Sequence, residues 1–246
     1  MTQKPLVSIL TASYNAENFI AASIESVLKS TYSNFELIIC DDNSKDCTVS
    51  IAEGYAKKDD RIKIFKNKKN LGDYPNRNKA ATYAKGKYIK YLDHDDTIYP
   101  WGLEAMVYCM EKFPQAGYGL ITNYKLEKPT EYPILVNPKE AYKIYFFEGK
   151  LFESGPTGAI FKRQAFEELG GFSGKPFVSD QEMWLTLSRK FDMVRMPADL
   201  IWWREHEGQE SKREKKDSES EIRRSLVIMD ALTHTSCPLP ENIKKI

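Results

Sequence analysis

Three short groups of polar side chains directly follow apolar runs in the first part of the chain. They span Thr11 to Asn15, Asp41 to Ser44 and Asp93 to Asp96. In an open parallel sheet the carboxyl ends of the strands meet at one edge, and ligands bind in the crevice beyond it. If the apolar runs are parallel strands, the three groups converge on one site with side chains suited to a nucleotide.

The third group carries the carboxylates of Asp93, Asp95 and Asp96. Carboxylates this close repel one another unless a cation or hydrogen bonds compensate. The chain has neither the G-x-G-x-x-G nor the G-x-x-x-x-G-K-[ST] phosphate loop, so a bound diphosphate needs another source of positive charge. A hard divalent cation takes one or two carboxylates and completes its shell with phosphate oxygens and water. We therefore expect a metal ion here, which stabilises negative charge as the diphosphate leaves.

Each group also has a purely structural explanation. Asn43 or Ser44 could cap a helix that begins near residue 46, although a cap leaves the two preceding aspartates unexplained. The segment from Asp93 to Asp96 could form an ordinary turn. Tyr14 alone would pack against the core, and only its place at a strand end favours stacking on a base.

Two polar residues of the second half have roles that their spacing does not decide. Asp180 lies near the start of a predicted helix, where Ser179 and Glu182 match a capping box. That cap leaves Asp180 at the first helical position, free to point outward or simply to interact with the helix dipole. His206 lies in the stretch Trp202-Trp203-Arg204-Glu205-His206 and could be a surface histidine.

The elements expected to position these groups alternate in type. Strands are predicted at 7–11, 35–40, 61–65 and 87–92, and helices at about 19–28, 46–57 and 75–85, the last one ending at Gly86. This alternation predicts an α/β fold with a parallel, doubly wound sheet flanked by helices.

The second half of the chain is less regular. Strands are predicted near 118–124 and 157–162, and helices near 138–147, 179–190 and 217–233. We expect them to make the sheet mixed and to add a smaller lobe, within one domain over residues 1–210. Residues 211–246 would form a helical extension, whose stripe of Ile222, Leu226 and Met229 could face the domain, a partner subunit or lipid.

Composition and charge exclude several classes of protein. The 246 residues carry 36 basic and 35 acidic side chains, so no basic excess indicates a nucleic-acid partner. The four cysteines lack zinc-site spacing and are interpreted as reduced thiols. Neither a signal peptide nor an apolar run of the ~20 residues needed to span a bilayer is visible. We expect a cytoplasmic protein, with contact to the inner membrane surface or a homodimer left open.

Taken together, these segments resemble glycosyltransferase family 2, whose members have the GT-A fold. The resemblance covers about residues 5–210 and rests on six motifs in the family's order, which are Val7 to Asn15, Phe35 to Ser44, Asn70 to Asn78, Ala84 to Asp96, Leu169 to Phe172 and Asp180 to Leu185. It implies a Rossmann-like half over 1–97 that binds the nucleotide sugar and an acceptor half over 98–210.

The resemblance also implies roles for single residues. Tyr14 and Asp42 would hold the nucleoside, with Thr11 nearby at the strand end and Arg77 beside the donor. Asp93 and Asp95 match the family's D-x-D, which binds Mn²⁺ or Mg²⁺, and His206 matches a histidine that completes this metal site in some members. Asp180 matches the general base. The residue before the base is usually acidic in this family and is Ser179 here. This departure puts the fine tuning of the base in doubt, although the base itself is retained.

The expected activity is an inverting transfer of a sugar from a nucleotide diphosphate donor to an acceptor hydroxyl. A UDP-sugar is the default donor, and a saccharide or lipid-linked saccharide is the expected acceptor, in polysaccharide or glycolipid synthesis. One alternative is a haloacid dehalogenase-type phosphatase, because Asp93-His94-Asp95-Asp96-Thr97 fits D-x-D-x-T. That superfamily places this motif on its first strand. The other alternative is a non-catalytic nucleotide-sugar-binding protein.

Overall fold

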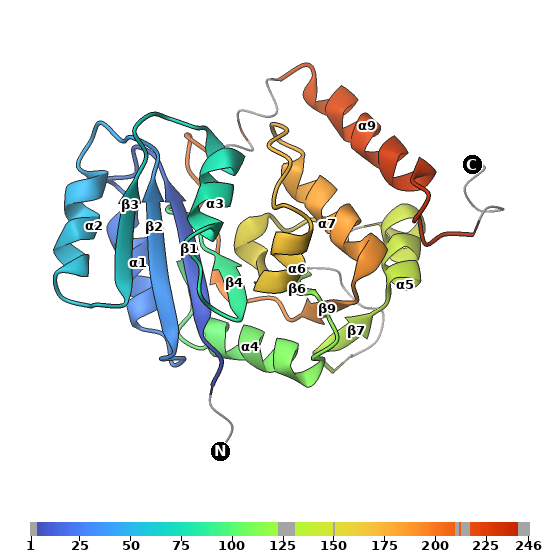
Figure 1. Cartoon of the computed structure of the whole chain (residues 1–246), viewed down its shortest axis with the longest axis horizontal. Coiled ribbons are helices and arrows are strands. Elements are labelled where there is room, and N and C mark those ends of the chain that lie inside the picture. Colours follow the sequence, from blue (N-terminus) through green and yellow to red (C-terminus); the bar gives the residue numbers. More distant parts are fainter. Residues whose placement is uncertain (1–3, 123–130, 150, 210–211, 213–216, 241–246) are drawn as a thin grey trace.

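A mixed central sheet organises the protein. The computed structural model describes residues 4–122, 131–149, 151–209, 212 and 217–240. Within these residues eight strands form one sheet in the order β3-β2-β1-β4-β8-β6-β9-β7, with helices on both faces (Figure 1). The predicted α/β class with a mostly parallel sheet in its first half is confirmed.

The first half is the parallel part of the sheet. Its elements are β1 (Val7–Ser13), α1 (Ile20–Leu28), β2 (Phe35–Asp41), α2 (Thr48–Ala56), β3 (Ile62–Lys66), α3 (Asp73–Ala81) and β4 (Tyr88–Tyr91). β1 pairs in parallel with β2 and with β4, and β2 pairs in parallel with β3. Both faces of β1 and β2 are covered, which explains their continuous apolar runs.

The second half closes the sheet with strands of both directions. Its elements are β5 (Thr97–Ile98), α4 (Gly102–Lys112), β6 (Tyr118–Ile121), β7 (Ile134–Val136), α5 (Pro138–Lys143), a π-helical turn (Ile144–Glu148), a 3-10 turn (Pro156–Gly158), β8 (Ala159–Lys162), α6 (Arg163–Glu168), α7 (Ser179–Lys190), β9 (Met193–Met196), β10 (Ile201–Trp202) and α9 (Ser220–Thr233). β8 lies antiparallel between β4 and β6, and the short strands β5 and β10 pair apart from the main sheet.

Two apolar cores lie on opposite faces of the sheet. Neighbouring residues of a strand point to opposite faces, so Ile9 belongs to one core and Leu10 to the other. The first core packs the sheet against α1, α2 and α4, and the second packs it against α3, α5, α6 and α7. The carboxyl ends of the parallel strands are thereby fixed relative to the start of α7.

The third helix differs from its predicted bounds. It runs from Asp73 to Ala81, so Gly86 does not end it. A Cβ at Gly86 would lie 2.6 Å from the Ser8 nitrogen, and the glycine therefore permits close contact with the backbone of β1. The conformation at this position is set by tertiary packing, which a local helix-stop pattern does not contain.

The last helix, α9, presents its predicted apolar stripe to solvent. Ile222, Leu226 and Met229 are each about 60% exposed, whereas Val227 and Ala231 are buried against the domain. α9 lies along α7 at the edge of the molecule (Figure 1). Within the described part of the chain, no helix combines the length and apolar character that crossing a membrane requires.

Candidate active site

A pocket of about 830 Å³ opens at the carboxyl ends of β1, β2 and β4. Predicted site residues that line it are Tyr14, Asp42, Arg77, Asp93, Asp95 and His206. Asp42 and Asp95 thus face the same space, as convergence of the strand ends requires. Thr11 is buried within β1 and is not among the lining residues; Ala12 and Ser13 reach the pocket instead.

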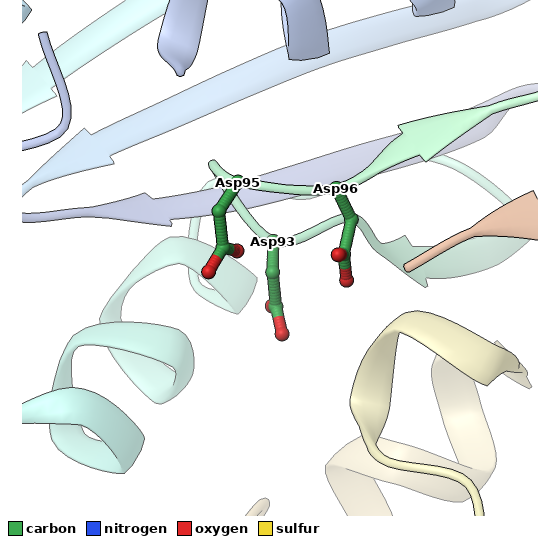
Figure 2. A group of neighbouring side chains, drawn as sticks. All are labelled: Asp93, Asp95 and Asp96. Carbon is green, nitrogen blue, oxygen red and sulfur yellow. The ribbon is translucent and has the colours of Figure 1, made fainter. Parts of the chain in front are cut away.

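The acidic turn between β4 and β5 forms one wall of the pocket. Ligand oxygens of Asp93, Asp95 and Asp96 all lie within 4.8 Å of one another. Figure 2 shows the three carboxylates pointing to the same side of the turn. Burial raises the pKa of Asp96 well above its usual range, and the charges of Asp93 and Asp95 raise it further. The turn therefore concentrates negative charge that favours a cation.

Arg77 partly compensates this charge. It lies on α3 with its side chain almost fully buried, and it forms ion pairs with Asp73 at 3.0 Å and with Asp93. Burial would raise the pKa of Asp93, but the Arg77 guanidinium lowers it below its usual range. Asp93 is therefore ionised at neutral pH. Arg77 lines the pocket, and its guanidinium contacts two acidic side chains of the pocket wall.

His206, which is distant from the acidic turn in the sequence, contacts it in the structure. Its Nε2 lies 2.9 Å from Oδ2 of Asp95, and its ring packs against that of Phe19 with centroids 4.6 Å apart. The Gly208 backbone N–H donates to Nδ1 at 3.2 Å. This contact assigns the proton of a neutral ring to Nε2, which then donates to Asp95.

The donor set of this wall fits a hard divalent cation. Asp93, Asp95 and Asp96 supply carboxylate oxygens and His206 supplies an imidazole nitrogen, all facing the same pocket. Mg²⁺ and Mn²⁺ prefer oxygen ligands and bind through few protein carboxylates when phosphate oxygens are present.

Asp42 also lines the pocket, and its carboxylate holds a neighbouring segment of the chain. Its carboxylate accepts hydrogen bonds from the backbone N–H groups of Leu71 and Gly72 at 2.8 to 2.9 Å, and from Nδ2 of Asn67 at 2.8 Å. Gly72 has φ 89° and ψ 168°, a conformation that glycine alone adopts without strain. Tyr14, 45% exposed, stands at the mouth of the pocket.

The group after β2 does not cap the next helix in the predicted way. α2 begins at Thr48, whose N–H donates to Oδ1 of Asp46 at 3.0 Å, so neither Asn43 nor Ser44 is the cap. Ser44 instead donates from its backbone N–H to Asp41 at 2.9 Å. The two aspartates therefore hold loops at the end of the sheet.

Asp180, in the first turn of α7, is not among the lining residues of the pocket but lies close to one of them, Gly155. A Cβ placed on Gly155, which lines the pocket, would be 3.9 Å from Oδ2 of Asp180. The predicted capping box is wrong, because Val178 is the N-cap residue and makes no side-chain cap. Ser179 is buried and donates to the carbonyl of Lys175, and Glu182 pairs with Lys175 at 2.6 Å.

Several lining residues were not among the predicted site residues. Glu153, Ser154 and Thr157 reach the pocket because β8, which follows them, lies antiparallel beside β4. No local pattern marks that long-range pairing. Trp203 packs against one core and also lines the pocket.

Comparison with known proteins identifies the fold and the family of this site. The chain matches the family described as "Glycosyl transferase family 2" over residues 8–170. It is 30% identical over 227 residues to an uncharacterized glycosyltransferase of Haemophilus influenzae, covering 86% of this chain and 69% of that protein. It is 43% identical over 122 residues to the Escherichia coli UDP-Glc:alpha-D-GlcNAc-diphosphoundecaprenol beta-1,3-glucosyltransferase WfgD, covering 48% of this chain and 47% of that protein.

Solved structures support the same fold. S. aureus TarS 1-349 in complex with UDP-GlcNAc superposes with a TM-score of 0.75 at 19% identity, over 97% of this chain and 69% of that one. The mannosyltransferase PcManGT from Pyrobaculum calidifontis, in complex with GDP-Man and Mn2+, superposes with a TM-score of 0.69 at 18% identity, over 94% of this chain and 64% of that one.

The chain spans less than half the length of several of its curated relatives. The phosphatase alternative finds no support, since the acidic turn follows β4 rather than a first strand.

Proposed function

The chain belongs to glycosyl transferase family 2, and we propose that it is a metal-dependent, inverting enzyme that transfers a sugar from a UDP-sugar to an acceptor hydroxyl. One observation carries the proposal: Asp42 and the Asp93–Asp95 pair, which follow different strands, line a single pocket together with His206. Its volume of about 830 Å³ lies within the range of small-molecule sites.

The nucleoside would lie between Tyr14 and Asp42. Tyr14 offers an exposed ring for stacking at the pocket mouth. Asp42 accepts from three donors of the segment between β3 and α3. A carboxylate has about four acceptor sites, so one is left for the imide N–H of uracil. The WfgD name and the TarS complex, which specify UDP-linked sugars, favour uridine for this chain as well.

The diphosphate would lie against the acidic turn. Asp93, Asp95 and His206 would hold a Mn²⁺ or Mg²⁺ ion there, for which the Mn2+ complex of PcManGT is a precedent. The bound ion offsets the negative charge that develops on the departing nucleoside diphosphate. Arg77 keeps Asp93 ionised and oriented toward this position.

Asp180 would act as the general base. It lies close to Gly155, which lines the pocket, and an acceptor hydroxyl would bind beside it. Its carboxylate would take the hydroxyl proton while the oxygen attacks the anomeric carbon from the side opposite the diphosphate. A single displacement of this kind inverts the anomeric centre, and positioned base catalysis contributes about 10²–10⁴-fold.

The acceptor would be a saccharide, either free or linked to lipid. The name of WfgD specifies a diphosphoundecaprenol-linked acceptor, which supports a similar class here. Such an acceptor would bring the enzyme to the cytoplasmic surface of a membrane. α9, with its exposed apolar residues, packs against α7, the helix that carries Asp180.

A panel of nucleotide sugars tests the proposal. We expect a UDP-sugar to raise the melting temperature with Mn²⁺ present, since a ligand at 100 times its Kd adds about 2.7 kcal/mol of stability. The same donor with a saccharide acceptor should release UDP, and NMR of the product should show an inverted anomeric configuration. Release of phosphate from a simple phosphate ester, without any response to nucleotide sugars, would refute the proposal.

A further inference from the structure

Lys90 is a buried lysine close to the acidic turn, and the proposed chemistry does not use this lysine. It lies in β4, is fully buried, and donates from Nζ to the carbonyl oxygens of Tyr91 and Thr157. Burying an amine is costly unless its hydrogen bonds are satisfied. The contact with Thr157 crosses from β4 to the Pro156–Gly158 turn, so it joins the two halves of the chain.

Thr157 continues this connection into the acidic turn. Its Oγ1 accepts from the backbone N–H of Asp93 at 3.0 Å, and the side chain is almost fully buried. The Thr157 hydroxyl therefore holds the backbone of the turn at the first of its three aspartates.

The segment just before Thr157 is tied to the helix that carries Asp180. The Ser154 carbonyl accepts from Nε1 of Trp184 in α7 at 3.0 Å, and the Ser154 hydroxyl donates to the carbonyl of Ile121. Gly155 is the residue that borders Asp180. Buried contacts thus connect the acidic turn to Trp184 in α7, the helix that also carries Asp180.

We propose that Thr157, held in place by Lys90, is a positioning residue that fixes the acidic turn relative to Gly155 and Asp180. This inference rests on the proposed function, which places the donor phosphates at the acidic turn and the acceptor beside Asp180. It predicts that the Thr157 hydroxyl contributes to the binding of metal and nucleotide through the Asp93 backbone that it holds.

Calorimetric titration of MnCl₂ and UDP into the protein tests the inference. Thr157→Val keeps the shape of the side chain but removes the hydroxyl, and we expect UDP affinity with Mn²⁺ to fall about 10-fold, because the backbone N–H of Asp93 loses its hydrogen-bond acceptor. Thr157→Ser restores the hydroxyl and should return the affinity to within about 3-fold of the unchanged protein. Thr233→Val, on the exposed face of α9, is the matched control and should have no effect.

The melting temperature separates positioning from a merely structural role. If Thr157→Val lowers the melting temperature but leaves the affinity for UDP with Mn²⁺ unchanged, the inference is wrong. Lys90→Met gives a second test, because it removes the hydrogen bonds that hold Tyr91 and Thr157. Weaker binding of UDP with Mn²⁺ supports positioning, and equal or tighter binding contradicts it. If the unaltered protein binds no nucleotide with Mn²⁺, the proposed function fails first.

Discussion

His206 and Asp95 are 111 positions apart in the chain, yet Nε2 of the histidine lies 2.9 Å from Oδ2 of the aspartate. The antiparallel pairing of β10 with β5 brings them together, because Asp95 lies just before β5 and His206 follows β10. The histidine donates to Asp95 while Gly208 donates to its Nδ1. Before Nε2 can bind a cation it must lose this proton, so metal binding changes the hydrogen bonds of the 206–208 turn.

Replacing His206 should weaken metal binding. In His206→Ala the imidazole ligand is lost, and we expect the Kd for Mn²⁺ measured with UDP present to rise about 10- to 100-fold, as for other losses around a metal site. His234→Ala is the matched control, because His234 is exposed at the end of α9. Equal Mn²⁺ affinities in the two variants would remove His206 from the site.

Replacing Asp180 should slow transfer without impairing donor binding. Asp180→Asn keeps the size of the side chain but removes the base, so kcat should drop about 10²–10⁴-fold while the Kd for UDP with Mn²⁺ stays within about 2-fold. Asp60→Asn, at an exposed position outside the pocket, should keep full activity. Normal turnover in Asp180→Asn would mean that another group takes the proton.

Two glycines should respond to alanine with opposite signs. Gly72 has φ 89° and presents its N–H to Asp42, so Gly72→Ala should lower the free energy of unfolding by about 1–3 kcal/mol and weaken UDP binding. Gly54 lies inside α2 with open space around it, so Gly54→Ala should raise stability by about 0.5–1 kcal/mol. Urea unfolding measures both changes, and destabilisation of similar size in both variants would contradict this account of the loop.

Lys90 should make stability depend on pH in the alkaline range. Burial lowers the pKa of Lys90 to about 7, although Asp93 and Asp96 oppose the change. In the unfolded chain the pKa is about 10.4, so between pH 7 and 10 the unfolded state binds more protons than the folded state. Stability contributed by this residue therefore rises with pH across that window.

The comparison with Lys90→Met isolates this effect from other titrating groups. Between pH 7.5 and 9.5 the free energy of unfolding of the unchanged protein should rise, relative to that of Lys90→Met, by on the order of 2 kcal/mol. Denaturant titrations at several pH values provide the measurement. Parallel pH profiles for the two proteins would show that the lysine keeps an ordinary pKa.

The sequence predicted the first half of the fold well because its signals are local. β1, β2 and β3 are apolar runs bounded by polar residues, and the parallel order places Asp42 and Asp95 on one edge by topology alone. The second half depends on pairings between distant segments. Neither β9 nor β10 was predicted. β10 has only two residues, too few for a recognisable pattern, and the charged Arg195 interrupts the apolar run of β9.

The same difference explains which site residues the sequence predicted. Asp93 and Asp95 are recognisable because carboxylates so close together in the sequence repel one another unless a cation or hydrogen bonds compensate. Thr157 has no local signal, because its role depends on the pairing of β8 with β4. The capping patterns at Ser44 and at Ser179 failed because buried contacts decided the positions of these side chains. Local rules identify charged clusters but do not identify the neutral groups that hold them.

The most direct test of the central claim is calorimetric titration of UDP into the unchanged protein and into Asp95→Ala, each with and without Mn²⁺. We predict that the unchanged protein binds UDP strongly only when Mn²⁺ is present, and that Asp95→Ala binds weakly in both conditions while keeping a normal melting temperature. UDP binding of the same strength in all four titrations would show that Asp95 holds no ion for the donor and would contradict the account.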